Sequence, residues 1–268
     1  MNNNNNNDLV DFFNAKAEQY NHISFIKDDP ICIPHQFTLK QDIEIAGFFA
    51  AILAWGNRTS IINSCNKLMK LMDNKPYQFI MEMQDAKPET LQRLMGFVHR
   101  TFNSTDLYYL LDFFSYHYGT QGNESLETAF TKGFNATDVD TENALNGFHR
   151  YVFSGDIHKD FPERTKKHIA APFKKSACKR LNMYLRWMVR NDDRGVDFGL
   201  WNTIKPCHLI CPIDVHVARV AKRFNLQDRK QNDWQSAVEL TSYLRKMDAT
   251  DPVKYDYALF GLGVIEKF

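Results

Sequence analysis

The chain has 268 residues, of which 44% are hydrophobic and 13% aromatic, enough to bury a sizeable core. No stretch approaches the roughly 18 to 20 apolar residues that a membrane helix needs. The five cysteines are odd in number and irregularly spaced, which argues against a disulfide framework and for reduced thiols. We therefore expect a globular cytoplasmic protein.

The net charge of +1 conceals an uneven distribution of charged residues. Residues 164–230 contain 16 Lys and Arg against 5 Asp and Glu, a net charge of +11, so the rest of the chain carries −10. Clustered positive charge of this kind indicates a polyanionic partner. Because the chain has no lipidation signal and no basic amphipathic terminus, we expect nucleic acid rather than a membrane.

The first forty residues contain two unlike segments. Residues 1–7 (MNNNNNN) are of low complexity and lack an apolar core, so we predict that they are disordered and carry no secretion signal, whereas residues 9–20 have helical spacing. Residues 28–37 form an extended segment broken by prolines, whose role the sequence leaves open. His35 lies near Asp28 and Asp29, but no helical spacing joins them, and a hydrogen-bonded turn is favoured over a metal site.

Helical periodicity dominates the middle of the chain. Residues 40–55 are almost wholly apolar after an acidic first turn, as is typical of a central core helix. Further helical segments are separated by Gly, Asn and Pro, at 76–84, 89–100, 106–118, 125–134 and 141–153. No alternating pattern competes, so we predict an all-α fold with less than about a tenth of its residues in strands.

The segment 174–190 reads as a helix with one apolar face and one polar stripe. Cys178, Leu181 and Leu185 recur at the helical period on the apolar face. The polar stripe consists of Lys175, Lys179, Asn182, Arg186 and Arg190. A solvated face of a half-buried helix is the simpler interpretation of this stripe, and an anion-binding cleft is the alternative.

A second helix is predicted to start at Asp214. Pro212 and Ile213 precede this residue and an apolar stripe follows it, so Asp214 stands at a helix N-cap. Capping free backbone N–H groups would be a sufficient structural role. A carboxylate held at a helix start can also stabilise a cation that forms in front of it.

Two further groups consist of residue types that can bind metals. Asp192 and Asp193 lie beside a glycine and are more typical of a turn. Cys207, His208, Cys211 and His216 lack the paired spacing that zinc sites use. We predict no metal site.

Two strings in the second half of the chain resemble a known superfamily. The string PIDVHVARVAKRFNL resembles the V-D-T-H-V-x-R-V-x-x-R segment of the helix-hairpin-helix DNA glycosylases, whose essential catalytic carboxylate corresponds to Asp214. The string ACKRLNMYLR resembles the lysine helix of the archaeal type of 8-oxoguanine DNA glycosylase, and the catalytic lysine falls on Lys179, 35 residues earlier. Nearly the whole chain also resembles an uncharacterised, mostly bacterial family usually placed beside those enzymes.

The resemblance implies roles for other residues. Trp55, Asn57 and Arg58 match a loop that enters DNA beside an extruded nucleotide. A helix that ends with Gly56 as its C-cap and Trp55 in the core would explain the same sequence. The last helix would line the base pocket through Tyr255, Asp256 and Phe260, with an amphipathic core helix as the simpler account. Candidate DNA contacts are Lys174, Lys175, Arg180, Arg186, His216, Arg219 and Arg223.

Two features depart from the superfamily pattern. The hairpin L-P-G-V-G is replaced by residues 171–175, APFKK, so a glycine-lined phosphate-binding turn is missing. No cysteine follows Cys211, so we expect no iron–sulfur cluster and no other cofactor.

The resemblance thus predicts a helix-hairpin-helix glycosylase-like fold, with the site between two helical subdomains. One would be a barrel-like domain, 41–190, that carries the Lys helix, and the other would combine 8–40 with 191–268. The predicted function is a monomeric DNA N-glycosylase with abasic-site lyase activity, removing an oxidised purine such as 8-oxoguanine from double-stranded DNA. The base would be flipped out and Lys179 would attack C1′. The alternatives are a catalytically silent DNA-binding protein and a metal-dependent hydrolase.

Overall fold

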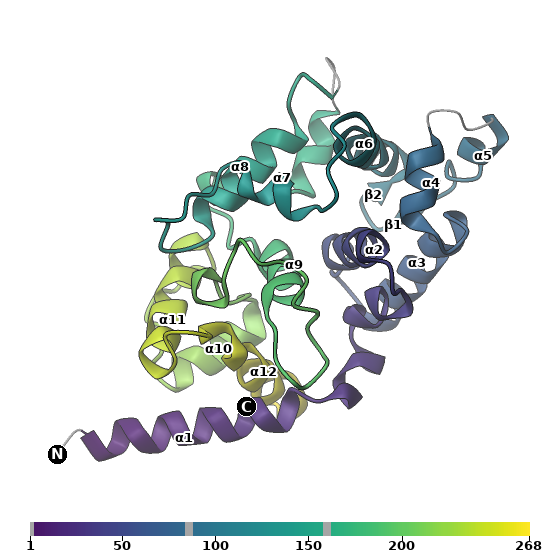
Figure 1. The fold of residues 1–268 in the computed structure, drawn as a ribbon. Coiled ribbons are helices and arrows are strands. Elements are labelled where there is room, and N and C mark those ends of the chain that lie inside the picture. The colour runs from purple at the N-terminus through teal and green to yellow at the C-terminus, as the bar shows by residue number, and fades with distance from the viewer. Residues whose placement is uncertain (1–2, 84–87, 158–161) are drawn as a thin grey trace. The chain divides into compact units, whose positions relative to one another are not determined.

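The computed structural model describes residues 3–83, 88–157 and 162–268, and it is mostly helical (Figure 1). Within those ranges the only strands are β1 (Val98–His99) and β2 (Phe102–Asn103), which pair as one small antiparallel hairpin. The predicted all-α class is therefore confirmed. None of the helices in these ranges is long and apolar enough to span a membrane.

The chain divides by its internal contacts into two compact units. Unit 1 comprises Met1–Ile26, Thr137–Glu142 and Ala171–Phe268, and unit 2 comprises Lys27–Ala136 and Asn143–Ala170. These units group the Lys179 helix with the two ends of the chain. The predicted domains, 41–190 and 8–40 plus 191–268, do not coincide with them and remain a prediction.

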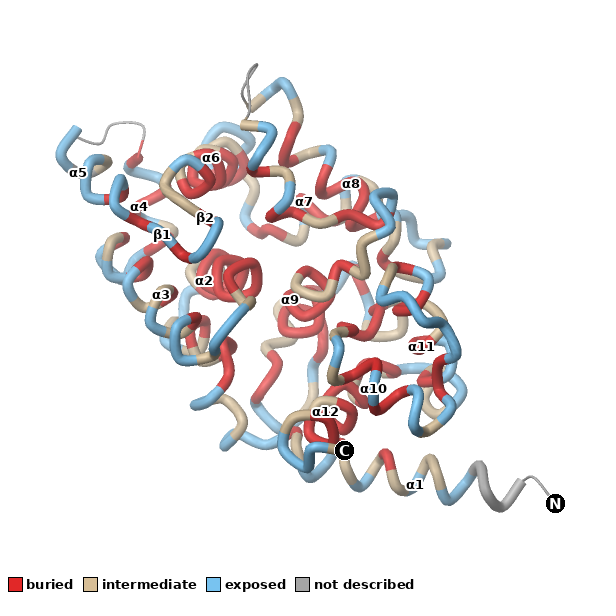
Figure 2. The backbone as a smooth tube through the Cα atoms, turned by 180° about the vertical axis from the view of Figure 1, so that it is seen from behind, coloured by how far each residue is buried: buried red, intermediate tan, exposed pale blue. Residues whose placement is uncertain are grey.

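Unit 2 is built around helix α2 (Lys40–Ile52), whose residues from Ile43 to Ile52 are all buried (Figure 2). The ring of Phe48 meets the edges of Phe114 and Phe148 at centroid distances of 5.3 and 5.9 Å. An apolar run of this length is buried all round because every face of the helix meets other helices. The surrounding helices are α3 (Arg58–Leu71), α4 (Pro76–Glu82), α5 (Pro88–Gln92), α6 (Ser104–Phe114), α7 (Glu127–Thr131) and α8 (Glu142–Val152).

A buried carboxylate ties α2 to the segment before α7. Glu44 is fully buried and accepts hydrogen bonds from Tyr118 Oη at 2.8 Å, Ser125 Oγ at 2.5 Å and the backbone N–H of Leu126 at 3.0 Å. Three donors on one buried carboxylate compensate for its loss of water.

The proline-broken segment before α2 is not extended, as we predicted, but forms short 3-10 turns at Pro30–Cys32 and Pro34–Gln36. Asp29 accepts a hydrogen bond from the backbone N–H of Ile31 at 3.0 Å and so caps the first of them. The role of Asp29 agrees with the hydrogen-bonded turn that the sequence favoured over a metal site.

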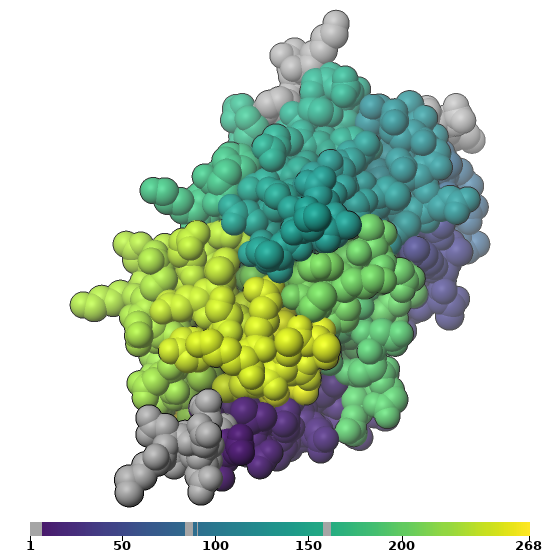
Figure 3. Space-filling model, turned by 60° about the vertical axis from the view of Figure 1, so that its left-hand side comes forward, coloured from purple at the N-terminus to yellow at the C-terminus, as the bar shows by residue number. Residues whose placement is uncertain are grey.

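Unit 1 packs a long N-terminal helix against the end of the chain. Helix α1 (Asn3–Tyr20) lies beside α12 (Tyr255–Phe260), as Figure 3 shows for the purple and yellow residues. Phe13 is fully buried there, with its ring 5.1 Å from that of Phe224. The other helices are α9 (Lys179–Val189), α10 (Val215–Arg223) and α11 (Trp234–Met247).

The asparagine run differs from its prediction. Helix α1 begins at Asn3, so residues 3–7 are helical where we predicted disorder, and residues 1–2 lie outside the described ranges. Extending an existing helix costs far less than starting a new one, so residues 8–20 can propagate into a run that would not nucleate alone.

We predict that His117 makes unit 2 sensitive to acid. Its ring is fully buried between Tyr151 Oη and the carbonyl of Ser125, and burial lowers its pKa to about 4. The unfolded chain binds a proton near pH 6.5 and the folded protein only near pH 4, so the free energy of unfolding falls as pH drops through that window. The loss should be on the order of 3 kcal/mol.

Urea unfolding at pH 4.5 and pH 6.5 measures this difference. His117→Gln should reduce the pH dependence, whereas His22→Gln, at an exposed position, should leave it unchanged. An equal pH dependence in wild type and His117→Gln would contradict the assignment.

Candidate active site

Lys179 is the first residue of α9, and the chain enters this helix through an unusual backbone conformation. Cys178, the residue before it, has φ 50° in the left-handed region and provides no side-chain cap. The Cys178 thiol is buried, and burial raises its pKa to about 12, so it stays protonated. The start of α9 is therefore fixed by packing of the chain rather than by a capping side chain.

Asp214 is the N-cap of α10, as predicted. Its Oδ1 accepts hydrogen bonds from the backbone N–H groups of His216 at 2.9 Å and Val217 at 3.0 Å. These bonds occupy one carboxylate oxygen and hold the side chain in place. Oδ2 makes the contact described next.

The two predicted catalytic residues meet. Lys179 Nζ lies 3.8 Å from Asp214 Oδ2, and the two side chains are 32% and 28% exposed. The pair joins the starts of two helices that are 35 residues apart in the sequence. A contact of this exposure adds little to stability, but it places an amine and a carboxylate where a bound molecule can reach both.

Buried polar groups lie close to this pair. The guanidinium of Arg186 donates to Asp256 Oδ2, and Cys211 Sγ lies 3.9 Å from Asp256 Oδ1. Burial raises the pKa of Asp256, although Arg186 and Lys179 oppose the shift. Burial and the neighbouring Asp256 also keep the pKa of Cys211 well above its usual range. Arg186, Asp256 and Cys211 thus contact one another close to Lys179 and Asp214.

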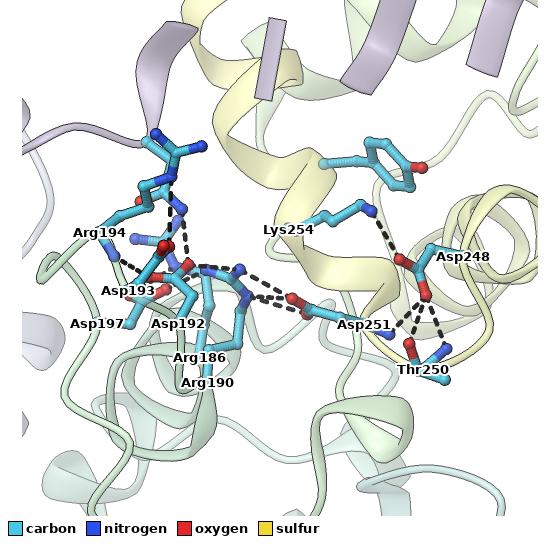
Figure 4. Close-up of polar contacts among 12 residues, drawn as sticks. Arg186, Arg190, Asp192, Asp193, Arg194, Asp197, Asp248, Thr250, Asp251 and Lys254 are labelled. Carbon is cyan, nitrogen blue, oxygen red and sulfur yellow. Dashed lines mark hydrogen bonds and ion pairs between the residues drawn. The ribbon is translucent and has the colours of Figure 1, made fainter. Parts of the chain in front are cut away.

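The polar stripe of α9 is not a solvated face. Asn182, Arg186 and Arg190 are only 1%, 4% and 2% exposed. Arg186 Nε is 3.3 Å from Asp197 Oδ1, and Arg190 Nη1 is 2.6 Å from Asp197 Oδ2 (Figure 4). The anion that the stripe requires is thus supplied by the protein's own carboxylates.

The predicted DNA contacts fall into separate groups. Lys174 and Lys175 are exposed, whereas Arg180 is half-buried and desolvation lowers its pKa. Arg186 is buried and bonded to carboxylates, which leaves it no surface for phosphate, so we correct its role to a structural one.

The contacts predicted on α10 lie against the end of the chain. Arg219 donates to the carbonyls of Phe268 and Gly263 at 2.8 and 2.7 Å, and the guanidinium of Arg223 lies 4.0 Å from the centre of the Phe268 ring. His216 is half-buried, and its backbone and Cβ closely approach Gly263. Arg219 and Arg223 are exposed but already engaged.

The turn that replaces the glycine hairpin has a glycine-like conformation at one position. Lys175 follows the 3-10 turn Pro172–Lys174 and has φ 60°, in the left-handed region that favours glycine. It occupies the place of the last glycine in L-P-G-V-G. The backbone thus adopts there a conformation that the sequence does not suggest.

The base-pocket candidates on α12 pack inside unit 1. Tyr255 is fully buried and donates its hydroxyl to Asn14 Oδ1 at 2.8 Å. Phe260 meets the ring of Phe25 edge-on, with centroids 5.6 Å apart. These contacts match an amphipathic core helix, whereas Asp256 lies close to Lys179 and Asp214.

Trp55, Asn57 and Arg58 belong to unit 2, between the end of α2 and the start of α3. Asn57 caps α3 by accepting from the backbone N–H of Ser60 at 3.3 Å. The guanidinium of Arg100 lies 4.8 Å from the centre of the Trp55 ring. Gly56 has φ 109°, where a side chain would be strained. Their place in a common site with Lys179 remains a prediction.

For metals, the described ranges contain no group of three His, Cys, Asp or Glu side chains arranged to hold an ion. Sequence reasoning missed Asp197 and Asp251, whose only signal in the sequence was the polar stripe on α9, for which an anion-binding cleft was the alternative. It identified Asp192 and Asp193 as turn residues, and Asp192 Oδ1 does accept from the backbone N–H of Arg194 at 3.0 Å.

These features define a mostly helical protein in which a lysine and an aspartate meet at two helix starts. The chain belongs to the family described as "Protein of unknown function (DUF2400)", which matches residues 29–265. No curated protein and no solved structure matches the chain.

We predict that the two roles of Asp214 can be separated by substitution. Asp214→Ala removes the cap of α10 and should lower the free energy of unfolding by about 1 kcal/mol. Asn caps a helix about as well as Asp, so Asp214→Asn should change the stability by only a few tenths of a kcal/mol. Urea unfolding of both variants tests this, and an Asn variant as unstable as the Ala variant would show that the charge itself holds the structure.

Proposed function

We propose that the protein is a DNA N-glycosylase with abasic-site lyase activity that removes an oxidised purine such as 8-oxoguanine from duplex DNA. The observation that carries this proposal is the 3.8 Å approach of Lys179 Nζ to Asp214 Oδ2. These are the two residues to which the resemblance assigns the nucleophile and the carboxylate, and they come from separate helices. A helix-hairpin-helix glycosylase fold and a base pocket near Trp55, Asn57 and Arg58 are part of the same proposal.

The chemistry begins with the unprotonated amine of Lys179. Its lone pair forms a bond to C1′ while the bond from C1′ to the base breaks, and the electron pair leaves with the base, which takes up a proton. Asp214 stabilises the positive charge that develops on the sugar and can accept the proton that Lys179 releases. The bond from C1′ to the ring oxygen then breaks, the ring oxygen takes up a proton and an imine forms. Loss of a proton from C2′ expels the 3′ phosphate by β-elimination and breaks the strand.

The surroundings of the pair favour a fixed geometry. Asp214 is held by two backbone N–H groups, and the Arg186–Asp256 pair lies close to it. Reactive groups work best when their own positions are locked by such contacts. Both reacting side chains keep about a third of their surface exposed, as a nucleophile that meets a macromolecular substrate requires.

Covalent trapping tests the reaction. Borohydride added to the protein with a duplex that contains 8-oxoguanine or an abasic site should reduce the imine and fix protein to DNA. Lys179→Gln should abolish the adduct, and Lys175→Gln, the neighbouring exposed lysine, should retain it. Asp214→Asn, which keeps the helix cap, should slow base release by at least about tenfold, the effect of losing one charge interaction in the transition state.

The outcomes of trapping separate the alternatives. No adduct on any lesion, with tight duplex binding retained, would indicate a catalytically silent DNA-binding protein. Activity abolished by a chelator and restored by a divalent metal would indicate a metal-dependent hydrolase.

We also predict that the exposed lysines before α9 contribute to the salt dependence of duplex binding. Lys174→Gln and Lys175→Gln should each reduce the slope of log affinity against log salt by about 0.9, because each removes one phosphate contact. Lys70→Gln, at an exposed position in the last turn of α3, is the matched control. Titration of a labelled duplex at several salt concentrations measures the slopes, and equal slopes in wild type and the two test variants would remove this docking surface.

A further inference from the structure

A cavity of about 430 Å³ lies in unit 1, away from the groups that the proposed reaction uses. Its walls are α1, the turn after α9 and the residues just before α12. The lining residues are Asn14, Ala17, Glu18, Asn21, Arg190, Asp192, Asp193, Arg194, Asp251 and Lys254. Figure 4 shows most of the charged ones and their bonds.

Negative charge is in excess around this cavity. Arg190 receives three carboxylates, with Nη1 2.6 Å from Asp197 Oδ2 and Nη2 2.9 Å from Asp192 and 2.8 Å from Asp251. Counting the neighbouring Arg186–Asp256 pair, two guanidiniums face four carboxylates. Asp192 and Asp251, with side chains 20% and 26% exposed, present this excess on the cavity wall.

The donors of Arg190 and Lys254 are already engaged, whereas Arg194, 43% exposed, is ion-paired with Asp193 and Glu18 at 3.5 and 4.0 Å. Arg190 Nε and Nη2 donate to Asp251, and the remaining bonds of its guanidinium go to Asp192 and Asp197. Lys254 Nζ donates to Asp248 at 2.6 Å. An anion would find few donors here, whereas the carboxylates keep lone pairs for a donor.

Asn21 provides an independent observation. It is 8% exposed and lines the cavity, and its Nδ2 donates to Asp192 Oδ2 at 2.7 Å. That bond fixes which end of the amide carries the oxygen, because a carboxylate accepts and does not donate. Among the described residues, Oδ1 then has no hydrogen-bond partner. A buried acceptor of this kind gains from a donor supplied by a ligand.

We propose that this cavity binds an organic cation that donates N–H hydrogen bonds, with a primary ammonium or a guanidinium group between Asp192, Asp251 and Asn21. The volume suits a small ligand or one long side chain. The described ranges hold no three-residue metal cluster, so an inorganic cation is not favoured. The same chemistry is offered by a free amine and by a Lys or Arg side chain of a partner polypeptide.

Calorimetric titration of the intact protein tests the site with three probes. These are putrescine, Nα-acetyl-lysine methylamide, and 1,4-butanediol as the uncharged analogue of putrescine. We expect saturable binding of at least one amine and none of the diol. Asp251→Asn should weaken binding by about tenfold or more, the scale of one lost charge-assisted hydrogen bond. Asp228→Asn, an exposed carboxylate outside the lining, should leave binding unchanged.

A second variant protects the test against misfolding. Ala17→Leu leaves every charge in place and narrows the cavity, so it should also weaken binding if Asp251→Asn fails to fold. Tighter binding of putrescine would identify a free amine, and tighter binding of the lysine derivative a polypeptide side chain. Absence of saturable binding by both amines, or equal binding by wild type and the cavity variants, would overturn the proposal. Neither result depends on glycosylase activity.

Discussion

Burial of two arginines on one face of α9 is the constraint on which unit 1 depends. Arg186 and Arg190 are 4% and 2% exposed, and a guanidinium cannot leave water without carboxylate partners. Asp197 serves both, while Asp251 and Asp256 each bind one of them. Removing one partner from such a network typically costs about 3–5 kcal/mol, because the remaining charge is left buried and unpaired.

This network determines how the chain returns to α9. The segment that carries Asp197 lies back along the helix, where the N–H groups of Phe198 and Trp201 donate to the carbonyls of Trp187 and Met188 at 2.8 and 3.0 Å. Replacing a buried ion pair by hydrophobic residues of similar volume is often neutral or stabilising, so these pairs are weak evidence for stability. Asp192 and Asp197 come from the segment after α9, and Asp251 and Asp256 come from just before and within α12, so the network joins both segments to α9.

Helices and caps, which depend on neighbouring residues, could be predicted from the sequence. The ion-pair partners of the buried arginines, which depend on the tertiary fold, could not. The helical period predicted α2 and α9, and a helix cap is a local signal, so Asp214 was found. A polar stripe looks the same in the sequence whether water or a buried carboxylate covers it. The partners Asp251 and Asp256 are 61 and 70 residues away, and Asp197, although only 7 residues past Arg190, follows a turn whose course the sequence does not give. For the same reason the +11 charge of residues 164–230 overstates the positive surface, since Arg186 and Arg190 are paired with Asp256 and Asp251, which lie outside that range.

Residues 175–179 depart most clearly from the backbone conformations and helix-start residues that are locally favoured. Lys175 and Cys178 both have positive φ, which costs roughly 1–2 kcal/mol for a residue with a side chain. Lys179 then places a basic group at the helix start, where the dipole disfavours it. Unfavourable choices of this kind persist when the surrounding structure imposes them, and they gather at functional sites. Their coincidence beside Asp214 favours chemistry at the start of α9 over its buried arginines, whose charges are already paired with carboxylates.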